Sequence, residues 1–404
     1  MINKYEARLG TERMLPLVFK MALPAVVAQF VNLLYSMVDR IYIGHIPDTG
    51  AMALTGVGVC MPLIMIITAF AALVGNGGAP RATIFMGKNK KDDAEKILAN
   101  CFTMQILLSI ILTVVLLIWN RDFLLAFGAS ANTIEYAASY MNIYALGTIF
   151  VQLTLGMNAF ITAQGFAKEG MLSVLIGAIA NIILDPIFIF GLHMGVRGAA
   201  LATVISQCCS CVWVISFLFG KRTTLRIRGK NMGLKAAYIL PCLALGSAIF
   251  IMQGSESIIS VCFNSSLLKY GGDIAVGAMT ILTSVMQFAM LPLQGLGQGA
   301  QPIISYNYGA HRYKRVKQAA VTMGIMALIY TLLAWLAIIL APEFLISIFS
   351  SDKSLLADAV PAMKLYFGAF IFMLLQYIGQ TIFKSLNKKK QAIFFSLLRK
   401  VIIV

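Results

Sequence analysis

Long apolar stretches recur along the whole chain, and they constrain its fold more than any other feature. At a rise of about 1.5 Å per residue, roughly 20 apolar residues cross the ~30 Å hydrocarbon core of a bilayer. Stretches of that length are residues 15–43, 51–85, 97–119, 134–163, 169–190, 197–219, 235–264, 273–306, 318–341 and 357–386. A further stretch begins near Gln391 and runs into the C-terminus. Together they predict an all-α membrane protein.

The composition agrees with a chain embedded in lipid. Its residues are 59% hydrophobic and only 12% charged, with a mean hydropathy of +0.85. A soluble globular protein does not need that much apolar surface. The first stretch is not a signal peptide, because it is too long and contains Pro24, Asn32 and Asp39. We therefore expect a multi-pass protein of the cell inner membrane.

The formal net charge of +16 makes the placement of the 32 basic residues important. About 24 of them fall on one side when the spans are threaded in order, and the positive-inside rule assigns that side to the cytoplasm. The N-terminus is then cytoplasmic, and the charge is explained without a nucleic-acid partner. The residues on this side are the N-terminal segment through Lys20, Arg81 to Lys96, Lys168, Lys221 to Lys235, Arg312 to Lys317 and Lys384 to Lys390.

An internal repeat divides the chain into two halves at an offset of 222 residues. Matches at this offset run through both loops and helices, which chance does not explain. Gly75, Gly77, Pro80 and Gly87 meet Gly297, Gly299, Pro302 and Gly309, and Phe127, Tyr144, Phe150 and Lys168 meet Phe349, Tyr366, Phe372 and Lys390. An even number of crossings per copy gives both copies one orientation, the parallel-repeat arrangement of transporters. We predict two tandem six-helix bundles.

The repeat also sets the expected domain boundaries. We expect an N-terminal six-helix lobe at residues 1–220, a cytoplasmic basic linker at 221–234 and a C-terminal lobe at 235–404. Val404 corresponds to Ile182, so the second copy stops inside its fifth helix. The last one and a half helices are therefore missing, and a complete relative should carry roughly that much more.

Acidic side chains inside the spans are the first candidates for chemistry. Of 16 acidic residues, only Asp39, Asp185 and Glu256 lie well inside predicted spans, and a carboxylate there costs about 2.5 to 3.5 kcal/mol. Asn181 precedes Asp185 by four residues and shares its helix face, while Pro186 frees a backbone carbonyl nearby. Such oxygens suit a hard cation or a proton. The alternatives are interhelical hydrogen bonding at Asn181 and Asp185, and an interfacial Asp39–Arg40 ion pair.

The candidate ion site belongs to the first half alone, because Asp39 falls on Val261 in the second copy. In the second half, our candidates for the substrate cavity are Gln253, Glu256 and Gln287. Glu256 would meet cationic substrates, although a local polar contact is the alternative. A second ionic site in this half is disfavoured, since its tenth stretch offers only Gln376 and Gln380 before Lys384.

Cysteines and histidines give no sign of a metal cluster, a disulfide framework or an enzyme. The seven cysteines lie in or beside apolar stretches, which is typical of small packing residues, and Cys208 and Cys211 have CxxC spacing without a second such pair elsewhere. No HExxH, GxSxG or paired-aspartate motif occurs at membrane depth. We expect no enzymatic activity and no cofactor.

Three segments carry a family resemblance. They are MVDRIYIG at 37–44, ANIILDPIFIFG at 180–191 and PLQGLGQGAQPIISYNYGA at 292–310. Together on a doubled six-helix frame, they resemble the multidrug and toxic compound extrusion (MATE) family, bacterial multidrug branch, from about Leu15 to the end. The resemblance implies a V-shaped transporter with a central cavity, which exports cationic or amphipathic drugs in exchange for H⁺ or Na⁺.

The resemblance also implies a cation or proton site in the N-terminal lobe. Carried over by position, it would comprise Asp39, Asn158, Asn181, Asp185 and Thr203, and Na⁺ would bind at all of these except Asn158. The expected partners are small-molecule drugs and the bilayer, and the expected oligomeric state is a monomer.

Two other transport functions are open to a chain of this kind. A flippase for a lipid-linked saccharide would use a similar frame but would line its cavity with several basic residues, whereas here they lie mostly in inner loops. An ion channel fits a doubled frame with a carboxylate site in one half less well than alternating access does.

Overall fold

The computed structural model describes residues 4–347 and 353–397, and the side chains of all of these except 4–7, 253–265, 267–277, 353–358 and 396–397. Every regular element in the described residues is helical. The elements are α1 (Lys4–Thr11), α2 (Met14–Gly44), α3 (Gly50–Gly87), α4 (Lys91–Ala126), α5 (Ile134–Leu146), α6 (Thr148–Ala163), α7 (Ala167–Pro186), η1 (Ile187–Gly191), α8 (Val196–Phe219), η2 (Gly229–Asn231), α9 (Ala236–Gly309), α10 (Tyr313–Leu340), α11 (Pro342–Ser347), α12 (Lys353–Gly368), α13 (Phe370–Ser385) and α14 (Lys389–Leu397).

The length and composition of these helices confirm an all-α, multi-pass membrane protein. Within the described residues, 7 helices are long and apolar enough to cross a bilayer, and up to 9 if each bent pair counts as one span. The bent pairs are α5 with α6, at 57°, and residues 359–368 of α12 with α13, at 43°. Two of the predicted spans, 134–163 and 357–386, are therefore broken near their middles.

The internal repeat is visible in the backbone as well as in the sequence. Asn89 and His311, 222 residues apart, both adopt left-handed φ angles, of 58° and 55°. Gly165 and Asn387 form a second pair at the same offset, with φ angles of 94° and 55°. L-residues rarely occupy this region, so matching turns at matching positions show that the two copies share one local fold.

Hydrogen bonds between helices repeat at the same offset. The Thr83 hydroxyl donates to the Ala163 carbonyl at 2.9 Å, and the Ser305 hydroxyl donates to the Ser385 carbonyl at 2.8 Å. The breaks within the bent pairs also correspond, since they fall at Gly147 and at position 369. The two copies thus agree in tertiary contacts that no sequence match required.

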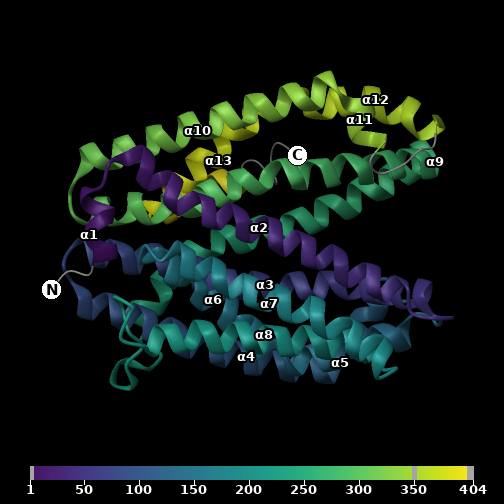
Figure 1. Cartoon of the computed structure of the whole chain (residues 1–404), viewed down its shortest axis with the longest axis horizontal. Coiled ribbons are helices and arrows are strands. Elements are labelled where there is room, and N and C mark those ends of the chain that lie inside the picture. Colours follow the sequence, from purple (N-terminus) through teal and green to yellow (C-terminus); the bar gives the residue numbers. More distant parts are fainter. Residues whose placement is uncertain (1–3, 348–352, 398–404) are drawn as a thin grey trace.

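The helices form two groups, with α2 lying along both of them (Figure 1). Helices α3 to α8 lie together on one side, and α10 to α13 lie on the other with α9. Helix α2 packs against both α7 and α9. At the α9 contact, a Cβ on Gly295 or Gly299 would overlap the backbone of Val26 or Ala22. The predicted six-helix N-terminal lobe is therefore not separate at α2, because two glycines on one face of α9 admit the helix closely.

Helix α9 contains both predicted spans 235–264 and 273–306. Its first part lies against α3, where a Cβ on Gly77 would overlap the Cys242 carbonyl. Its last part also lies against α3, where a Cβ on Gly87 would overlap the Tyr306 carbonyl. Gly77 and Gly87 are only about 15 Å apart along their helix, so the 74-residue α9 turns back on itself.

Backbone contact between α3 and α9 closes one end of the molecule. Besides the contacts at Gly77 and Gly87, a Cβ on Gly309 would overlap the Ile84 carbonyl. We call this contact the glycine seam, and the end where it lies the basic end, because the loops 87–91, 309–313 and 386–390 gather there. Any side chain larger than hydrogen would hold the two helices apart at these positions.

The predicted linker packs against the first group of helices. Glu95 of α4, only 1% exposed, pairs with Arg228 at 2.9 Å. The Asn100 side chain donates to the Asn231 carbonyl at 3.3 Å and accepts from the Lys235 amide at 2.8 Å. These contacts tie residues 221–235 to α4, because burying the Glu95 carboxylate requires a partner charge.

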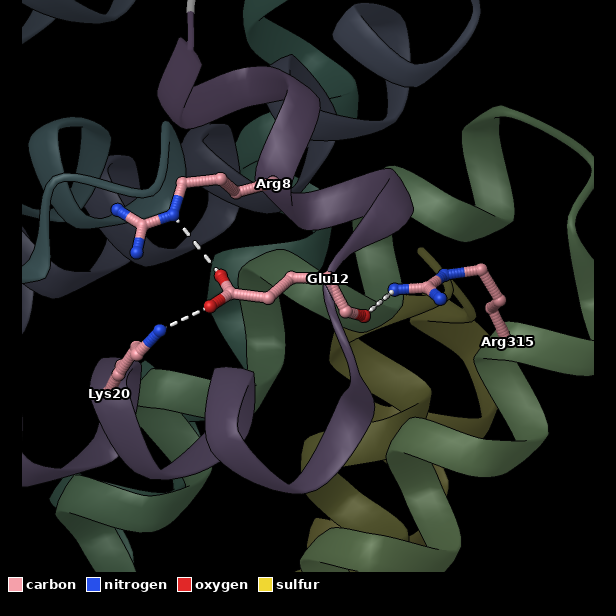
Figure 2. Close-up of polar contacts among 4 residues, drawn as sticks. All are labelled: Arg8, Glu12, Lys20 and Arg315. Carbon is pink, nitrogen blue, oxygen red and sulfur yellow. Dashed lines mark hydrogen bonds and ion pairs between the residues drawn. The ribbon is translucent and has the colours of Figure 1, made fainter.

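Helix α1 lies across the basic end and is held by α9 and α10. The Asn307 side chain donates to the Leu9 carbonyl at 2.9 Å, and Arg315 donates to the Glu12 carbonyl at 2.8 Å. Figure 2 shows Arg8 and Lys20 converging on the Glu12 carboxylate. The hydrogen bond from Lys20 lowers the Glu12 pKa, so this stabilisation persists at neutral pH and is lost only as pH falls through the lowered value.

Enlarging a glycine of the seam should separate the two lobes at the basic end. In Gly309→Val, overpacking of about 1 to 3 kcal/mol would shift the equilibrium roughly 5- to 150-fold toward separation. Alkylation of Cys101 and Cys242, both buried beside the seam, should accelerate accordingly. Gly58→Val is the control, because a Cβ at Gly58 meets nothing within 4 Å. Equal alkylation rates in both variants would contradict this account.

Removing the Arg315 contacts should loosen α1. Arg315 also donates to the Asn307 amide oxygen at 3.2 Å, so Arg315→Gln loses two charge-assisted hydrogen bonds. We expect amide exchange of residues 8–12 to rise roughly tenfold to a hundredfold, as measured by hydrogen–deuterium exchange. Lys317→Gln, an exposed change nearby on α10, should leave this exchange unchanged. Unaltered protection in Arg315→Gln would show that α1 is held by other contacts.

Candidate cation site

The end of α7 brings two polar residues to one buried face. Asn181 and Asp185 are four residues apart and both 0% exposed. Helix α7 ends at Pro186, and the π-helical turn Ile187–Gly191 follows. Proline has no amide hydrogen to donate, so the helical hydrogen-bond pattern changes at this point as the sequence predicted.

Asp39 of α2 lies near Asp185 at this face. The two carboxyl groups are close enough to influence each other electrostatically, although they come from different helices. Asp39 is 8% exposed, whereas Arg40 is exposed, and the ion pairs in the described part of the chain do not include an Asp39–Arg40 pair. The structure thus favours a buried polar site over the interfacial ion pair that the sequence left open.

Asn181 and Thr203 complete the group. The Asn181 amide nitrogen donates to Asp185 Oδ1 at 3.2 Å and reaches Thr203 Oγ1 of α8 at 3.5 Å. Three buried oxygens have no hydrogen-bond partner, namely Asp39 Oδ1, Asp185 Oδ2 and Asn181 Oδ1. A buried unpaired polar group costs about 1 to 3 kcal/mol. Clustered oxygen acceptors of this kind can bind a proton or a hard cation.

Two tyrosines that the sequence analysis did not name border this group. Tyr140 of α5 interacts with Thr203 and lies near Asp39, and Tyr35 lies near both carboxylates. Tyr35 precedes Asp39 by four residues, so helical spacing could have identified it. Nothing local marks Tyr140, because its position depends on how α5 packs against α8.

Asn158 lies away from the other predicted site residues. Its amide donates to the Gly170 carbonyl at 3.2 Å, near the start of α7. Gly170 precedes Asn181 by eleven residues, which is about 16 Å along a helix. The structure therefore gathers Asp39, Asn181, Asp185 and Thr203 but does not bring Asn158 to them.

The candidates for the substrate cavity lie mostly outside the description. Gln253 and Glu256 are in the part of α9 whose side chains are not described, while Gln287 is exposed on the same helix. Gln380, which the sequence analysis set aside, is buried on α13 and donates to the Met252 sulfur at 3.4 Å. Among the described residues, no group of three or more His, Cys, Asp or Glu side chains could hold a metal ion.

A comparison of the sequence with protein-family models identifies the family of this chain. The MatE family model matches residues 24–187 and 248–404, which is most of the chain and includes Asp39, Asn181 and Asp185, while Thr203 lies between the two matched segments. The chain belongs to the MatE family. The three sequence motifs predicted this assignment.

Curated relatives of this MatE protein are bacterial export proteins. The multidrug export protein MepA of Staphylococcus haemolyticus (strain JCSC1435) is 25% identical over 343 residues, covering 85% of this chain and 75% of that protein. MepA of Staphylococcus aureus (strain N315) is 22% identical over 388 residues, covering 95% and 84%.

Solved structures share the fold. An outward-facing multidrug resistance MATE family transporter of the MOP superfamily matches with a TM-score of 0.91 at 21% identity, covering 100% of this chain and 89% of that one. A MOP superfamily transporter from Pyrococcus furiosus, described as having a binding pocket of reverse polarity, matches equally at 0.91 and 21%, covering 99% and 89%. At this identity the likeness shows the fold alone.

The contact between Asn181 and Asp185 should appear as an energetic coupling. In a double-mutant cycle of Asn181→Ala and Asp185→Ala, we expect a coupling energy of about 0.5 to 3 kcal/mol. Equilibrium unfolding in mixed micelles measures it. Asn181→Ala with Asn158→Ala is the control pair and should be additive within about 0.5 kcal/mol, because the two share no partner. Equal coupling in both cycles would contradict the placement of Asn158.

Proposed function

We propose that this MatE protein exports cationic or amphipathic small molecules by antiport, driven by H⁺ or Na⁺ entering through Asp39 and Asp185. The observation that supports this most is the proximity of two buried carboxyl groups from different helices. Two ionised carboxylates cannot remain so close without a proton or a cation between them. The proposed ligand set for Na⁺ is Asp39, Asn181, Asp185 and Thr203.

Helix α2 connects this site to the lobe arrangement. It carries Asp39 against α7, and its earlier part packs against Gly295 and Gly299 of α9. When the site is occupied, α2 and α7 stay together. When it is empty and both carboxylates are ionised, their repulsion favours another position of α2. Ion and drug then stabilise different states, which is the condition for coupling.

The energetics set the stoichiometry. One proton entering down 100 mV gains about 2.3 kcal/mol, and each pH unit adds about 1.4 kcal/mol. With one proton per uncharged drug, 100 mV and one pH unit support a gradient of roughly several hundred-fold. A monovalent cationic drug cancels the voltage term and leaves about tenfold. Strong export of cations therefore requires more than one ion per cycle, which two carboxylates provide.

The substrate class and the orientation are parts of the same proposal. The similarity to multidrug export proteins supports small-molecule drugs as substrates. The gathering of basic loops at the end that carries the glycine seam supports a cytoplasmic location for this end and for the N-terminus, in the inner membrane. We take the protein to act as a monomer and without an organic cofactor.

A saccharide flippase remains the alternative, because the fold alone does not separate the two functions. The transporter of reverse pocket polarity matches as well as the multidrug transporter does. The buried carboxyl pair favours ion-coupled export, and the transport measurement below distinguishes the two functions.

Neutralising either carboxylate should abolish coupled export. In vesicles under separately imposed Na⁺ and pH gradients, Asp39→Asn and Asp185→Asn should reduce a drug gradient of roughly several hundred-fold to none, with drug binding retained. Asp122→Asn, an exposed carboxylate at the far end of α4, is the matched control. The gradient that drives the unmodified protein identifies the ion. Wild-type efflux in both site variants would sink the mechanism.

A further inference from the structure

Two adjoining hollows open at the basic end, where the two lobes meet. The first, of about 400 Å³, is lined by Arg81, Phe85 and Lys88 of the first lobe and by Tyr308, Asn387 and Lys388 of the second. The second, of about 440 Å³, shares Lys88 and continues past Lys90 and His311. We call the first the interlobe hollow. It exists only while the glycine seam is closed, since each lobe supplies part of its wall.

The interlobe hollow carries positive charge without compensation. Arg81, Lys88 and Lys388 line it, and no acidic residue does. In the described part of the chain, none of these three cations forms an ion pair with a carboxylate. The Lys88 ammonium instead lies 5.5 Å from the centre of the Phe85 ring, which also faces the hollow. Cations gathered in this way attract an anion.

Polar atoms in the wall lack partners. Arg81 Nε and Asn387 Oδ1 are both buried without a hydrogen bond. A buried guanidinium N–H is costly to leave unpaired, and rotation of the Asn387 amide would present a second donor to the same space. A planar guanidinium beside two ammonium groups matches the geometry and charge of a phosphate group better than those of a halide.

The internal repeat shows that the fold itself does not need these cations. At an offset of 222 residues, Arg81 and Lys88 correspond to Ile303 and Ala310, and Lys388 corresponds to Phe166. The backbone turns at these places match, as the φ angles at Asn89 and His311 show. At each of these three pairs of positions, one copy of the repeat has a cation and the other copy has an uncharged residue on the same fold. The positive-inside rule explains an excess of basic residues in cytoplasmic loops. It does not explain why Arg81 Nε is buried without a hydrogen bond.

We propose that the interlobe hollow binds the phosphate group of an anion and that the bound anion bridges the two lobes. Arg81 and Lys88 hold it from the first lobe, and Lys388 with the Asn387 amide holds it from the second. Because the site is split when the lobes separate, binding stabilises the state in which the basic end is closed. The binding site stands apart from the carboxyl pair, and only its effect on transport depends on the proposed antiport cycle.

The test measures binding to the intact protein and to one variant in each lobe. Inorganic phosphate is titrated at constant ionic strength against protein in detergent, and the apparent Tm is followed. A second arm compares nanodiscs of phosphatidylcholine with nanodiscs containing increasing phosphatidylglycerol. The variants are Lys88→Gln and Lys388→Gln, both at exposed side chains. Lys390→Gln is the control, being basic, exposed and two residues from Lys388 but outside the hollow.

We expect a saturable rise in Tm for the unmodified protein and for Lys390→Gln. In Lys88→Gln and in Lys388→Gln, half-saturation should require at least about tenfold more phosphate or phosphatidylglycerol. A rise in the first arm assigns the site to free phosphates, and a rise confined to the second assigns it to a lipid headgroup. The proposal is overturned if neither arm shows a saturable rise, if all three variants respond alike, or if only one lobe's lysine matters.

Discussion

The proximity of Asp39 and Asp185 is the constraint around which the N-terminal lobe is arranged. Two carboxyl groups removed from water need donors, a proton or a cation, and the structure supplies only part of what they need through Asn181. Neighbouring residues supply further polar groups. Thr203 and Tyr140 lie beside the pair, and the helical hydrogen-bond pattern of α7 changes at Pro186. Lipid offers no polar partner at this depth.

The second constraint is backbone contact along the glycine seam, and its consequences lie at the opposite end of α2. Because Gly77, Gly87 and Gly309 admit α3 and α9 so closely, the loops that follow them meet and form the basic end. The interlobe hollow depends on this closure, because its cations come from both lobes and the seam brings them together. Interactions that stabilise the basic end therefore also favour the conformation in which the glycine seam is closed.

Features that depend on local spacing were predictable from the sequence, whereas those that depend on packing between helices were not. The 222-residue offset predicted two copies of one fold, and four-residue spacing predicted that Asn181 and Asp185 share a face. Neither could show that α2 lies along both lobes, that residues 221–235 fasten to α4 or that Asn158 faces Gly170. Those placements depend on side-chain size at contacts far apart in sequence, which periodicity does not record.

The two copies of the repeat share a backbone but have diverged in charge, and this divergence is what the proposed antiport cycle uses to give a symmetric frame a direction. The carboxyl pair has no counterpart in the second copy, where Val261 takes the place of Asp39, and the cations Arg81 and Lys88 have none either. Helix α2 runs from the α9 contact at Ala22 to Asp39, about 25 Å along one helix. In the proposed antiport cycle, a displacement of Asp39 would be transmitted along α2 to its contact with Gly295 and Gly299 of α9.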